Sequence, residues 1–189
     1  SNVWAAPTEP PTISLDNNEI EENNAEGELI GNLSYVPSDP NSSVAYSLGG
    51  EDAGSFSVSD SSLYAGQTSF DYEAANAFQI EITATEIPGG AKETKSFTIN
   101  IIDVNEAPTG LNLSGTSITE NASSGTLLGF ISAEDPDGKP EFAFYQFTVV
   151  DSLYFYVDQG KLKNSQPLDY EQNNFHTIQI QAVDTNKPA

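Results

Sequence analysis

The sequence predicts an all-β protein made of two tandem seven-stranded Greek-key β-sandwiches, the second of which lacks its last strand. Two observations carry this prediction: apolar and polar residues alternate along short segments, and the whole pattern occurs twice, 98 residues apart. No segment of helical length carries apolar residues at the i, i+3, i+4 and i+7 positions that a helix would bury. About seven short strands per copy, separated by turn residues, favour a sandwich.

Strands are expected wherever apolar and polar residues alternate. In the first copy this alternation runs through residues 44–48, 78–84 and 97–101, and shorter apolar runs surround Phe56 and Leu63. Successive side chains of a strand point to opposite faces, so each segment would bury one face and expose the other. These segments predict the half-buried strands of a sandwich.

Four motifs of the first copy return in the second at the same offset, which indicates tandem copies of one domain. The pattern restarts near Pro108 after a short polar stretch. We therefore expect a linker or tag remnant over residues 1–10, a first domain over 11–107 and a second over 108–189. The motif pairs are Ile20-Glu21-Glu22-Asn23 with Ile118-Thr119-Glu120-Asn121, Leu29-Ile30-Gly31 with Leu127-Leu128-Gly129, Asp71-Tyr72-Glu73 with Asp169-Tyr170-Glu171, and Ile80-x-Ile82-x-Ala84 with Ile178-x-Ile180-x-Ala182.

The end of the second copy departs from the first. After Ala182-Val183-Asp184 there is no counterpart of the strand expected at residues 97–101. The second domain is therefore expected to be incomplete at its C-terminal side, with an unpaired strand edge. Truncation and interruption by an inserted domain both explain this, and the sequence leaves both open.

Composition excludes several classes of function. The chain has 28 Asp and Glu against 6 Lys and Arg, a formal net charge of −22. Nucleic acids and anionic membranes bind basic surfaces, so we expect no nucleic-acid partner. No apolar run approaches the ~18 residues of a spanning helix, which argues against direct membrane insertion. With no Cys and a single His, His176, zinc sites and nucleophile-base pairs have almost no candidates, and we expect no enzyme.

Acidic residues gather in short motifs. Asp103-Val104-Asn105-Glu106-Ala107-Pro108 crosses the domain boundary, and Asp135-Pro136-Asp137-Gly138 places two carboxylates on a turn. Asp71 and Glu73 lie two residues apart, so both project to one face if that segment is extended. Carboxylates clustered without basic partners destabilise a fold unless a cation neutralises them, and Ca²⁺ accepts 6–8 oxygen ligands in flexible geometry. The motifs therefore predict calcium binding.

Together with Glu22 and Ala182-Val183-Asp184, these motifs resemble the cadherin repeat in the form found in large bacterial surface proteins. The resemblance covers nearly the whole chain from about Thr12 onward. It implies immunoglobulin-like or cadherin-like sandwiches and about three Ca²⁺ ions at the domain junction.

The same resemblance implies a ligand set for each ion. The first ion would be held by Glu22, Asp71, Glu73, Glu106 and the carbonyl of Val104. The second would be held by Glu22, Glu73, Asp103, the same carbonyl and Asp137. The third would be held by Asn105, the carbonyl of Ala107, Asp135, Asp137 and Asp184. Because this linker is one residue shorter than in animal cadherins and has Glu106 where Asp is usual, the first and third sites are expected to differ in geometry.

Two further regions correspond to incomplete sites. Glu120, Asp169 and Glu171 repeat the acids of the first domain and predict half a site. Asn41 stands where the second copy has Asp137, and residues 1–7 contain no carboxylate side chain. We therefore expect little calcium ahead of the first domain.

The resemblance implies a calcium-dependent extracellular adhesion module within a large, secreted bacterial surface adhesin. Its partners would be Ca²⁺ and a protein or carbohydrate ligand on another cell, or a second copy of itself. The alternative is a structural scaffold that displays an inserted sugar-binding or peptide-binding domain in an adhesin or secreted enzyme. Paired carboxylates at glycosidase spacing would be a third function, but the same acids are already assigned as metal ligands.

Overall fold

The computed structural model describes residues 12–66, 69–138 and 145–185. Contacts divide the chain into unit 1, Ser1–Val104, and unit 2, Asn105–Ala189. The predicted N-terminal linker over residues 1–10 lies outside the described residues, and the predicted domain limits stay a prediction. No helix in the described ranges is long and apolar enough to cross a membrane.

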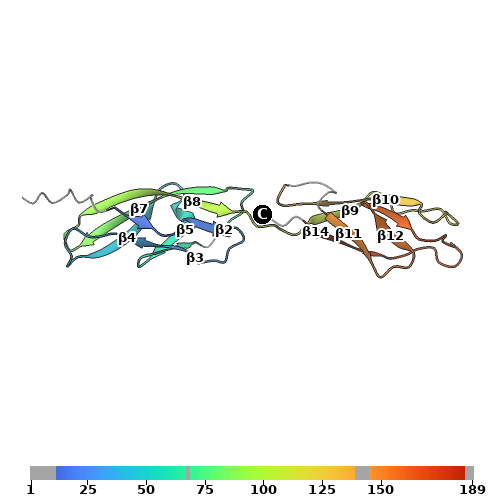
Figure 1. The fold of residues 1–189 in the computed structure, drawn as a ribbon, viewed down its shortest axis with the longest axis horizontal. Helices are drawn as coiled ribbons and strands as arrows, with labels where there is room; N and C mark the ends of the chain where they lie inside the picture. The colour runs from blue at the N-terminus through green and yellow to red at the C-terminus, as the bar shows by residue number, and fades with distance from the viewer. Residues whose placement is uncertain (1–11, 67–68, 139–144, 186–189) are drawn as a thin grey trace, which may run out of the picture. The chain divides into compact units, whose positions relative to one another are not determined.

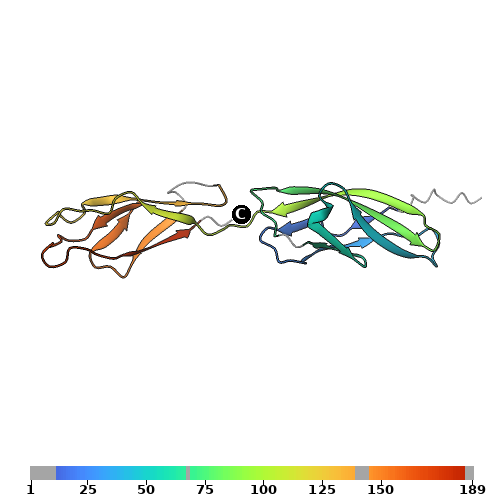
Figure 2. The same ribbon diagram turned by 180° about the vertical axis from the view of Figure 1, so that it is seen from behind.

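Unit 1 is a sandwich of two four-stranded sheets, visible from opposite sides in Figures 1 and 2. All neighbouring strands are antiparallel except β2 and β8, which run parallel. A short 3-10 helix, Ala53–Ser55, precedes β5. One sheet contains, in order, β1 (Ser14–Leu15), β3 (Leu29–Ser34), β6 (Ser62–Ala65) and β5 (Phe56–Ser59); the other contains β2 (Glu19–Glu21), β8 (Lys92–Ile102), β7 (Ala77–Ile87) and β4 (Ser43–Gly49).

The all-β prediction is confirmed, with one difference in the strand count. In its described residues, unit 1 has eight strands where about seven were expected, and its first two short strands, β1 and β2, belong to different sheets. The chain changes sheets at residues 16–18, close to Gly31 of β3. A Cβ at Gly31 would collide with the backbone oxygen of Asn17, so the crossing requires glycine there.

The core of unit 1 lies between its sheets and follows the predicted alternation. Ile80, Ile82 and Ala84 of β7 are 0–1% exposed, and Ile99 of β8 is fully buried. Phe56, Phe70 and Phe78 pack together, with ring centroids 5.0–5.8 Å apart. The inward positions of adjacent strands thus form one continuous apolar cluster.

Unit 2 contains counterparts of the first sheet of unit 1 and of part of its second sheet. Its larger sheet contains, in order, β12 (Phe155–Asp158), β13 (Lys161–Asn164), β10 (Leu127–Glu134) and β9 (Thr109–Leu113). Its second sheet contains β11 (Tyr145–Val150) and β14 (Gln179–Asp184). The positions that the offset of 98 makes equivalent to β8 would follow Ala189, so the predicted incompleteness of the second domain stays a prediction.

The repeat extends to individual hydrogen bonds. Asn23 N donates to Phe70 O at 2.9 Å, and Asn121 N donates to Leu168 O at 2.8 Å. Both asparagines have φ of 56°, a left-handed conformation that Asn tolerates better than most residues. The offset of 98 residues therefore relates equivalent positions in space as well as in sequence.

Glu86, in β7, is a buried carboxylate held by neutral donors. It is 4% exposed, and it accepts hydrogen bonds from the backbone N and the hydroxyl of Ser38 at 2.8 and 2.7 Å and from the Tyr35 hydroxyl at 3.1 Å. The Ser38 bonds are the main cause that lowers the pKa of Glu86 below its ordinary value of 4.5.

This lowered pKa predicts a dependence of stability on pH. Because the folded-state pKa is below the unfolded one, the stabilising contribution is complete above the unfolded pKa and is lost as the pH falls through the folded value. We expect the difference in unfolding free energy between wild type and Glu86→Gln to be largest near neutral pH and to shrink below about pH 4.5. Denaturant titrations at several pH values measure it; a difference independent of pH would contradict the prediction.

Candidate metal centre

In unit 1, three carboxylates meet where β2 and β8 end. Parallel pairing sets Glu21 opposite Ile102, so the next residues, Glu22 and Asp103, follow their strands at the same end of the sheet. Carboxylate oxygens of Glu22, Glu73 and Asp103 lie within 4.8 Å of one another. The sheet topology therefore assembles this acidic cluster, which we call cluster A.

Glu22 is the most constrained member of cluster A. It is 4% exposed, its Oε1 accepts from Val104 N at 2.8 Å, and its Oε2 accepts from Tyr72 N at 2.8 Å. Its backbone N donates to Ile102 O at 3.0 Å. These bonds fix the carboxylate and leave each oxygen a second lone pair for another partner.

The Asp71-Tyr72-Glu73 segment is a turn and not the extended segment that would place both acids on one face. Ala75 N donates to Asp71 O at 3.0 Å, and Ala74 N donates to the Asp71 carboxylate at 3.0 Å. Glu73 joins cluster A, whereas Asp71 is outside the group of oxygens within 4.8 Å. Its assignment to the first ion stays a prediction.

In unit 2, a second acidic cluster contains Asp135, Asp137 and Asp184, with carboxylate oxygens within 4.8 Å of one another. Asp137 N donates to Asp135 Oδ1 at 2.9 Å, which folds the Asp-Pro-Asp turn back on itself. Glu106 N donates to Asp137 Oδ2 at 3.1 Å. This group, cluster B, therefore contacts the linker segment through backbone hydrogen bonding.

Tyr145 belongs to cluster B, although the sequence gave no indication of it. It lies opposite Asp184 in the β11–β14 pair, and its hydroxyl donates to Asp135 Oδ2 at 2.6 Å. Burial is the main cause that raises the pKa of Tyr145, followed by the Asp135 hydrogen bond and the charges of Asp135, Asp184 and Asp137. The tyrosine therefore stays a donor in a strongly negative environment.

Glu86 is the residue of unit 1 that is equivalent to Asp184 of unit 2, and its surroundings differ. Glu86 and Asp184 are 98 residues apart in the repeat, but Glu86 is stabilised by Ser38 and Tyr35, which are neutral. Asp184 instead lies with two further carboxylates. Negative charge that a cation would neutralise therefore accumulates around Asp184, in cluster B, and not around Glu86.

A third group contains Glu120, Asp169 and Glu171 of unit 2, all exposed, with oxygens within 4.8 Å of one another. Tyr170 N donates to Glu120 Oε2 at 3.3 Å, as Tyr72 N does to Glu22 in unit 1. The two acidic groups are thus built on the same repeat, and Glu22 is far more buried than Glu120.

The remaining predicted ligands lie in the linker. Val104 donates its N–H to Glu22, and Asn105 Nδ2 donates to Glu106 O at 3.3 Å. Ala107 is exposed. The predicted ligation by the carbonyls of Val104 and Ala107, the Asn105 side chain and the Glu106 carboxylate stays a prediction.

The donors of clusters A and B are carboxylate oxygens, a hard set that suits Ca²⁺. Each cluster already orients its acids through backbone or tyrosine hydrogen bonds. Such preorganised carboxylates fit a cation that accepts many oxygens in flexible geometry. They do not form the His or Cys set that zinc requires.

Comparisons with known proteins give one consistent result. Residues 115–189 match the family model described as "Cadherin domain". The chain is 34% identical over 122 residues to Cadherin-20 of Xenopus laevis, covering 62% of this chain and 15% of that protein. It is 29% identical over 178 residues to Protocadherin-1 of Homo sapiens, covering 88% of this chain and 17% of that protein. The chain therefore spans less than a fifth of the length of these relatives.

Solved structures agree on the fold. Human Protocadherin-24 EC1-2 superposes with a TM-score of 0.68 at 18% identity, covering 94% of this chain and 88% of that chain. The Protocadherin GammaB4 extracellular domain superposes with a TM-score of 0.66 at 20% identity, covering 97% of this chain and 31% of that chain. At this identity, the likeness establishes the β-sandwich fold.

Proposed function

Because the chain belongs to the cadherin family, we propose that it is a calcium-dependent extracellular adhesion module. In this proposal, Ca²⁺ binds clusters A and B and the linker residues. Bound ions would make the junction of the two domains rigid. The proposed ligands are Glu22, Asp71, Glu73, Asp103, Val104, Asn105, Glu106, Ala107, Asp135, Asp137 and Asp184.

Cluster A is the observation that carries this proposal. Glu22 is nearly buried beside two other carboxylates, and burying negative charge in this way costs free energy unless a cation compensates it. The backbone N–H groups of Tyr72 and Val104, which donate to Glu22, offset part of that cost. A bound Ca²⁺ supplies the remaining compensation.

The charge of the proposed ligands fits about three ions. Eight carboxylates contribute −8, and three Ca²⁺ contribute +6, so the filled site is close to neutral. Without calcium, the same acids repel one another across the linker segment and favour a flexible junction. The eight are Glu22, Asp71, Glu73, Asp103, Glu106, Asp135, Asp137 and Asp184.

Membership of the cadherin family also bears on the predicted lack of enzymatic activity and on the predicted extracellular location. Cadherin domains are non-enzymatic adhesion modules, so the prediction that the chain is not an enzyme is confirmed. The matching relatives include extracellular cadherin domains, which supports an extracellular location. The relatives named above come from animals, and the bacterial origin and the carbohydrate ligand stay predictions.

We expect microspheres coated with this chain to aggregate in millimolar Ca²⁺ and to disperse when a chelator is added. Extracellular calcium modules bind at roughly 10⁻⁴–10⁻³ M, so the transition should fall in that range. Microscopy or light scattering measures aggregate size across a calcium series.

Asp137→Ala is the test variant, because Asp137 is assigned to two ions, and Asp158→Ala is the matched control. Asp158 lies on β12, pairs with Lys163 at 2.6 Å and belongs to neither cluster. Spheres carrying Asp137→Ala should stay dispersed, whereas the control should behave as wild type. Aggregation of wild type that persists in chelator would reject calcium-dependent adhesion.

A further inference from the structure

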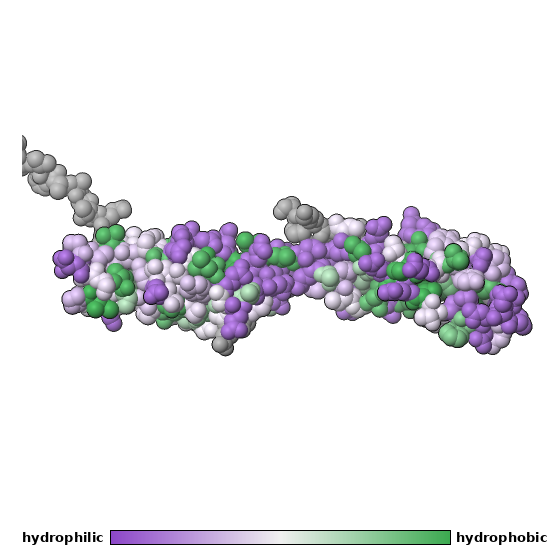
Figure 3. All heavy atoms as spheres, turned by 90° about the horizontal axis from the view of Figure 1, so that it is seen from below, coloured by the Kyte–Doolittle hydropathy of each residue, from purple (hydrophilic) through white to green (hydrophobic). Residues whose placement is uncertain are grey.

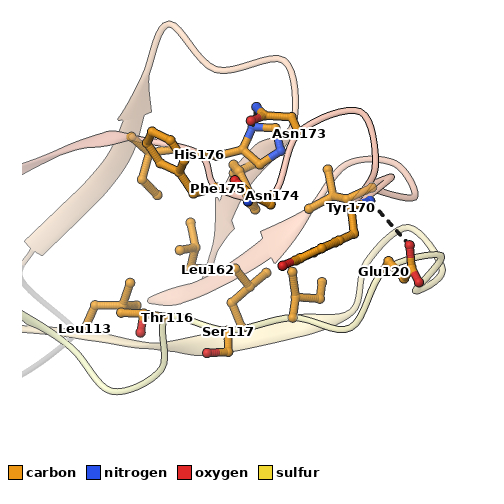
Figure 4. Close-up of a pocket in the computed structure, with 15 residues that line it drawn as sticks. Leu113, Thr116, Ser117, Glu120, Leu162, Tyr170, Asn173, Asn174, Phe175 and His176 are labelled. Atoms are coloured by element: carbon orange, nitrogen blue, oxygen red, sulfur yellow. Dashed lines mark hydrogen bonds between the residues drawn. The ribbon is translucent and has the colours of Figure 1, made fainter.

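The outer face of the larger sheet of unit 2 carries two of the six basic residues of the chain. Figure 3 shows that apolar and hydrophilic residues are mixed on the surface of unit 2. In β13, Leu162 is 1% exposed, and Figure 4 shows it on the inner side of the sheet, as is Leu113 of β9. Because side chains alternate along a strand, Lys161 and Lys163 lie on the outer side. They add positive charge to a chain whose net charge is −22.

Aromatic and acidic side chains surround these two lysines. The strand register places Tyr156 of β12 opposite Lys163. It places Lys161 between Phe130 of β10 and Asp158 of β12. Phe130 is 49% exposed and Tyr156 is 38% exposed, whereas Asp158 Oδ2 accepts from Lys163 Nζ at 2.6 Å. These five residues, which we call the lysine face, therefore combine two exposed rings with one positive charge in excess.

Unit 1 shows that the sandwich does not require the residues of the lysine face. The inner side of the sheet is the same in both units, since Leu63 of β6 is as buried as Leu162. On the outer side, unit 1 has no basic residue at the equivalent positions, and the Ser62 hydroxyl donates to Asn32 Oδ1 at 3.0 Å. The rings and lysines thus distinguish unit 2 from its own repeat. The equivalent residues are Asn32, Ser57, Ser59, Ser62 and Tyr64.

The arrangement of the lysine face favours an acidic saccharide over other acidic ligands. Lys is depleted from the cores of protein interfaces, but both lysines lie on β13, between the strands that carry the rings. Nucleic acids require a basic stripe, and anionic membranes bind clusters of about four to eight basic residues. An acidic saccharide has fewer charges, and the apolar C–H surfaces of its sugar rings can pack on aromatic side chains.

We propose that the lysine face binds an extended acidic oligosaccharide that contains uronic acids. The saccharide crosses the strands between Tyr156 and Phe130, whose strands are two spacings apart, roughly 9–10 Å. A uronate carboxylate pairs with Lys161, and Asp158 accepts hydrogen bonds from sugar hydroxyls. The inference goes beyond the proposed function, because none of the residues of the lysine face is a proposed calcium ligand.

Uronic-acid oligosaccharides and their uncharged forms test the ligand class. Fluorescent hexasaccharides of hyaluronan and of galacturonate are titrated with the full chain in millimolar Ca²⁺ at physiological salt, which screens the charges of distant acids. The control ligands are the same hexasaccharides with their carboxyl groups reduced to alcohols. We expect anisotropy to report binding of at least one acidic form and binding of its reduced form that is on the order of tenfold weaker.

Unit 1 supplies the substitutions that test the residues. Phe130→Asn combined with Tyr156→Ser, and separately Lys161→Ser, install the residues of unit 1 at exposed or half-exposed positions. Each variant should bind the acidic hexasaccharide roughly tenfold more weakly. Lys92→Ser is the matched control, because it removes an exposed lysine from β8 of unit 1, and it should bind as wild type does. Unchanged melting temperatures and calcium stoichiometries separate a lost saccharide site from misfolding and from lost calcium sites.

Several results would overturn the proposal. These are no binding of either acidic hexasaccharide, equal binding of acidic and reduced forms, and equal affinities of wild type and Lys161→Ser. A glutamate hexapeptide that binds as tightly as the saccharides would assign the face to an acidic protein. Sedimentation that shows self-association of the wild type, lost in Phe130→Asn/Tyr156→Ser, without saccharide binding would assign it to a second copy. Calcium titration of the same samples decides the proposed calcium sites independently.

Discussion

Replacement of Glu22 by alanine is expected to remove calcium binding by cluster A and to destabilise unit 1. The substitution leaves the N–H groups of Val104 and Tyr72 without the acceptor that each bonds at 2.8 Å. Hydrogen bonds to a charged group contribute about 1.5–3 kcal/mol each, so the loss of two such bonds should lower the unfolding free energy of unit 1 by about 3–6 kcal/mol. Denaturant titration of the calcium-free protein measures this loss separately from the loss of calcium.

The repeat provides the matched control, Glu120→Ala. Glu120 occupies the equivalent position in unit 2, but it is exposed and accepts a longer hydrogen bond, 3.3 Å, from Tyr170. We expect its replacement to cost less than about 1 kcal/mol and to leave the calcium affinity of cluster A unchanged. Equal effects of the two substitutions would show that burial and the Val104 contact have no special importance for Glu22.

Replacement of Ile82 in β7 by alanine is expected to destabilise unit 1 strongly. Ile82 is 0% exposed and belongs to the apolar cluster between the two sheets. Buried Ile to Ala substitutions cost about 2–5 kcal/mol, because they remove apolar contacts and leave a cavity. Chemical denaturation measures the loss, with the two units followed by separate probes because they need not unfold together.

Ile180→Ala is the matched substitution in unit 2. Ile180 is at the equivalent position of β14, but no described strand lies on its far side, and it is only partly buried. We expect a loss of about 1–2 kcal/mol, since less apolar surface is returned to water. A loss as large as that of Ile82→Ala would show that the core of unit 2 is as complete as that of unit 1.

The alternating pattern and the repeat were sufficient to predict the fold. Inward positions such as Ile80 and Ile82 follow directly from period-two alternation, and the offset transferred the result to Ile178 and Ile180. These features depend on local sequence, which the chain displays directly.

The details of the acidic clusters depend on tertiary contacts that the sequence does not display. The parallel pairing of β2 with β8, which brings Glu22 to Asp103, joins segments about 80 residues apart. Tyr145 was missed because two tertiary contacts place it in cluster B: its hydrogen bond to Asp135 and the β11–β14 register, which sets it opposite Asp184. Asp71 was placed beside Glu73 on the assumption of an extended segment, whereas turn hydrogen bonds determine its position.

Isothermal titration of the chelated chain with Ca²⁺ tests most directly whether the two acidic clusters bind calcium. We predict about three ions per chain with affinities of roughly 10⁻⁴–10⁻³ M, a rise in melting temperature over the same range, and fewer ions in Glu22→Ala and Asp137→Ala. Wild-type protein that takes up no calcium at about 10 mM and melts at the same temperature with and without chelator would contradict it.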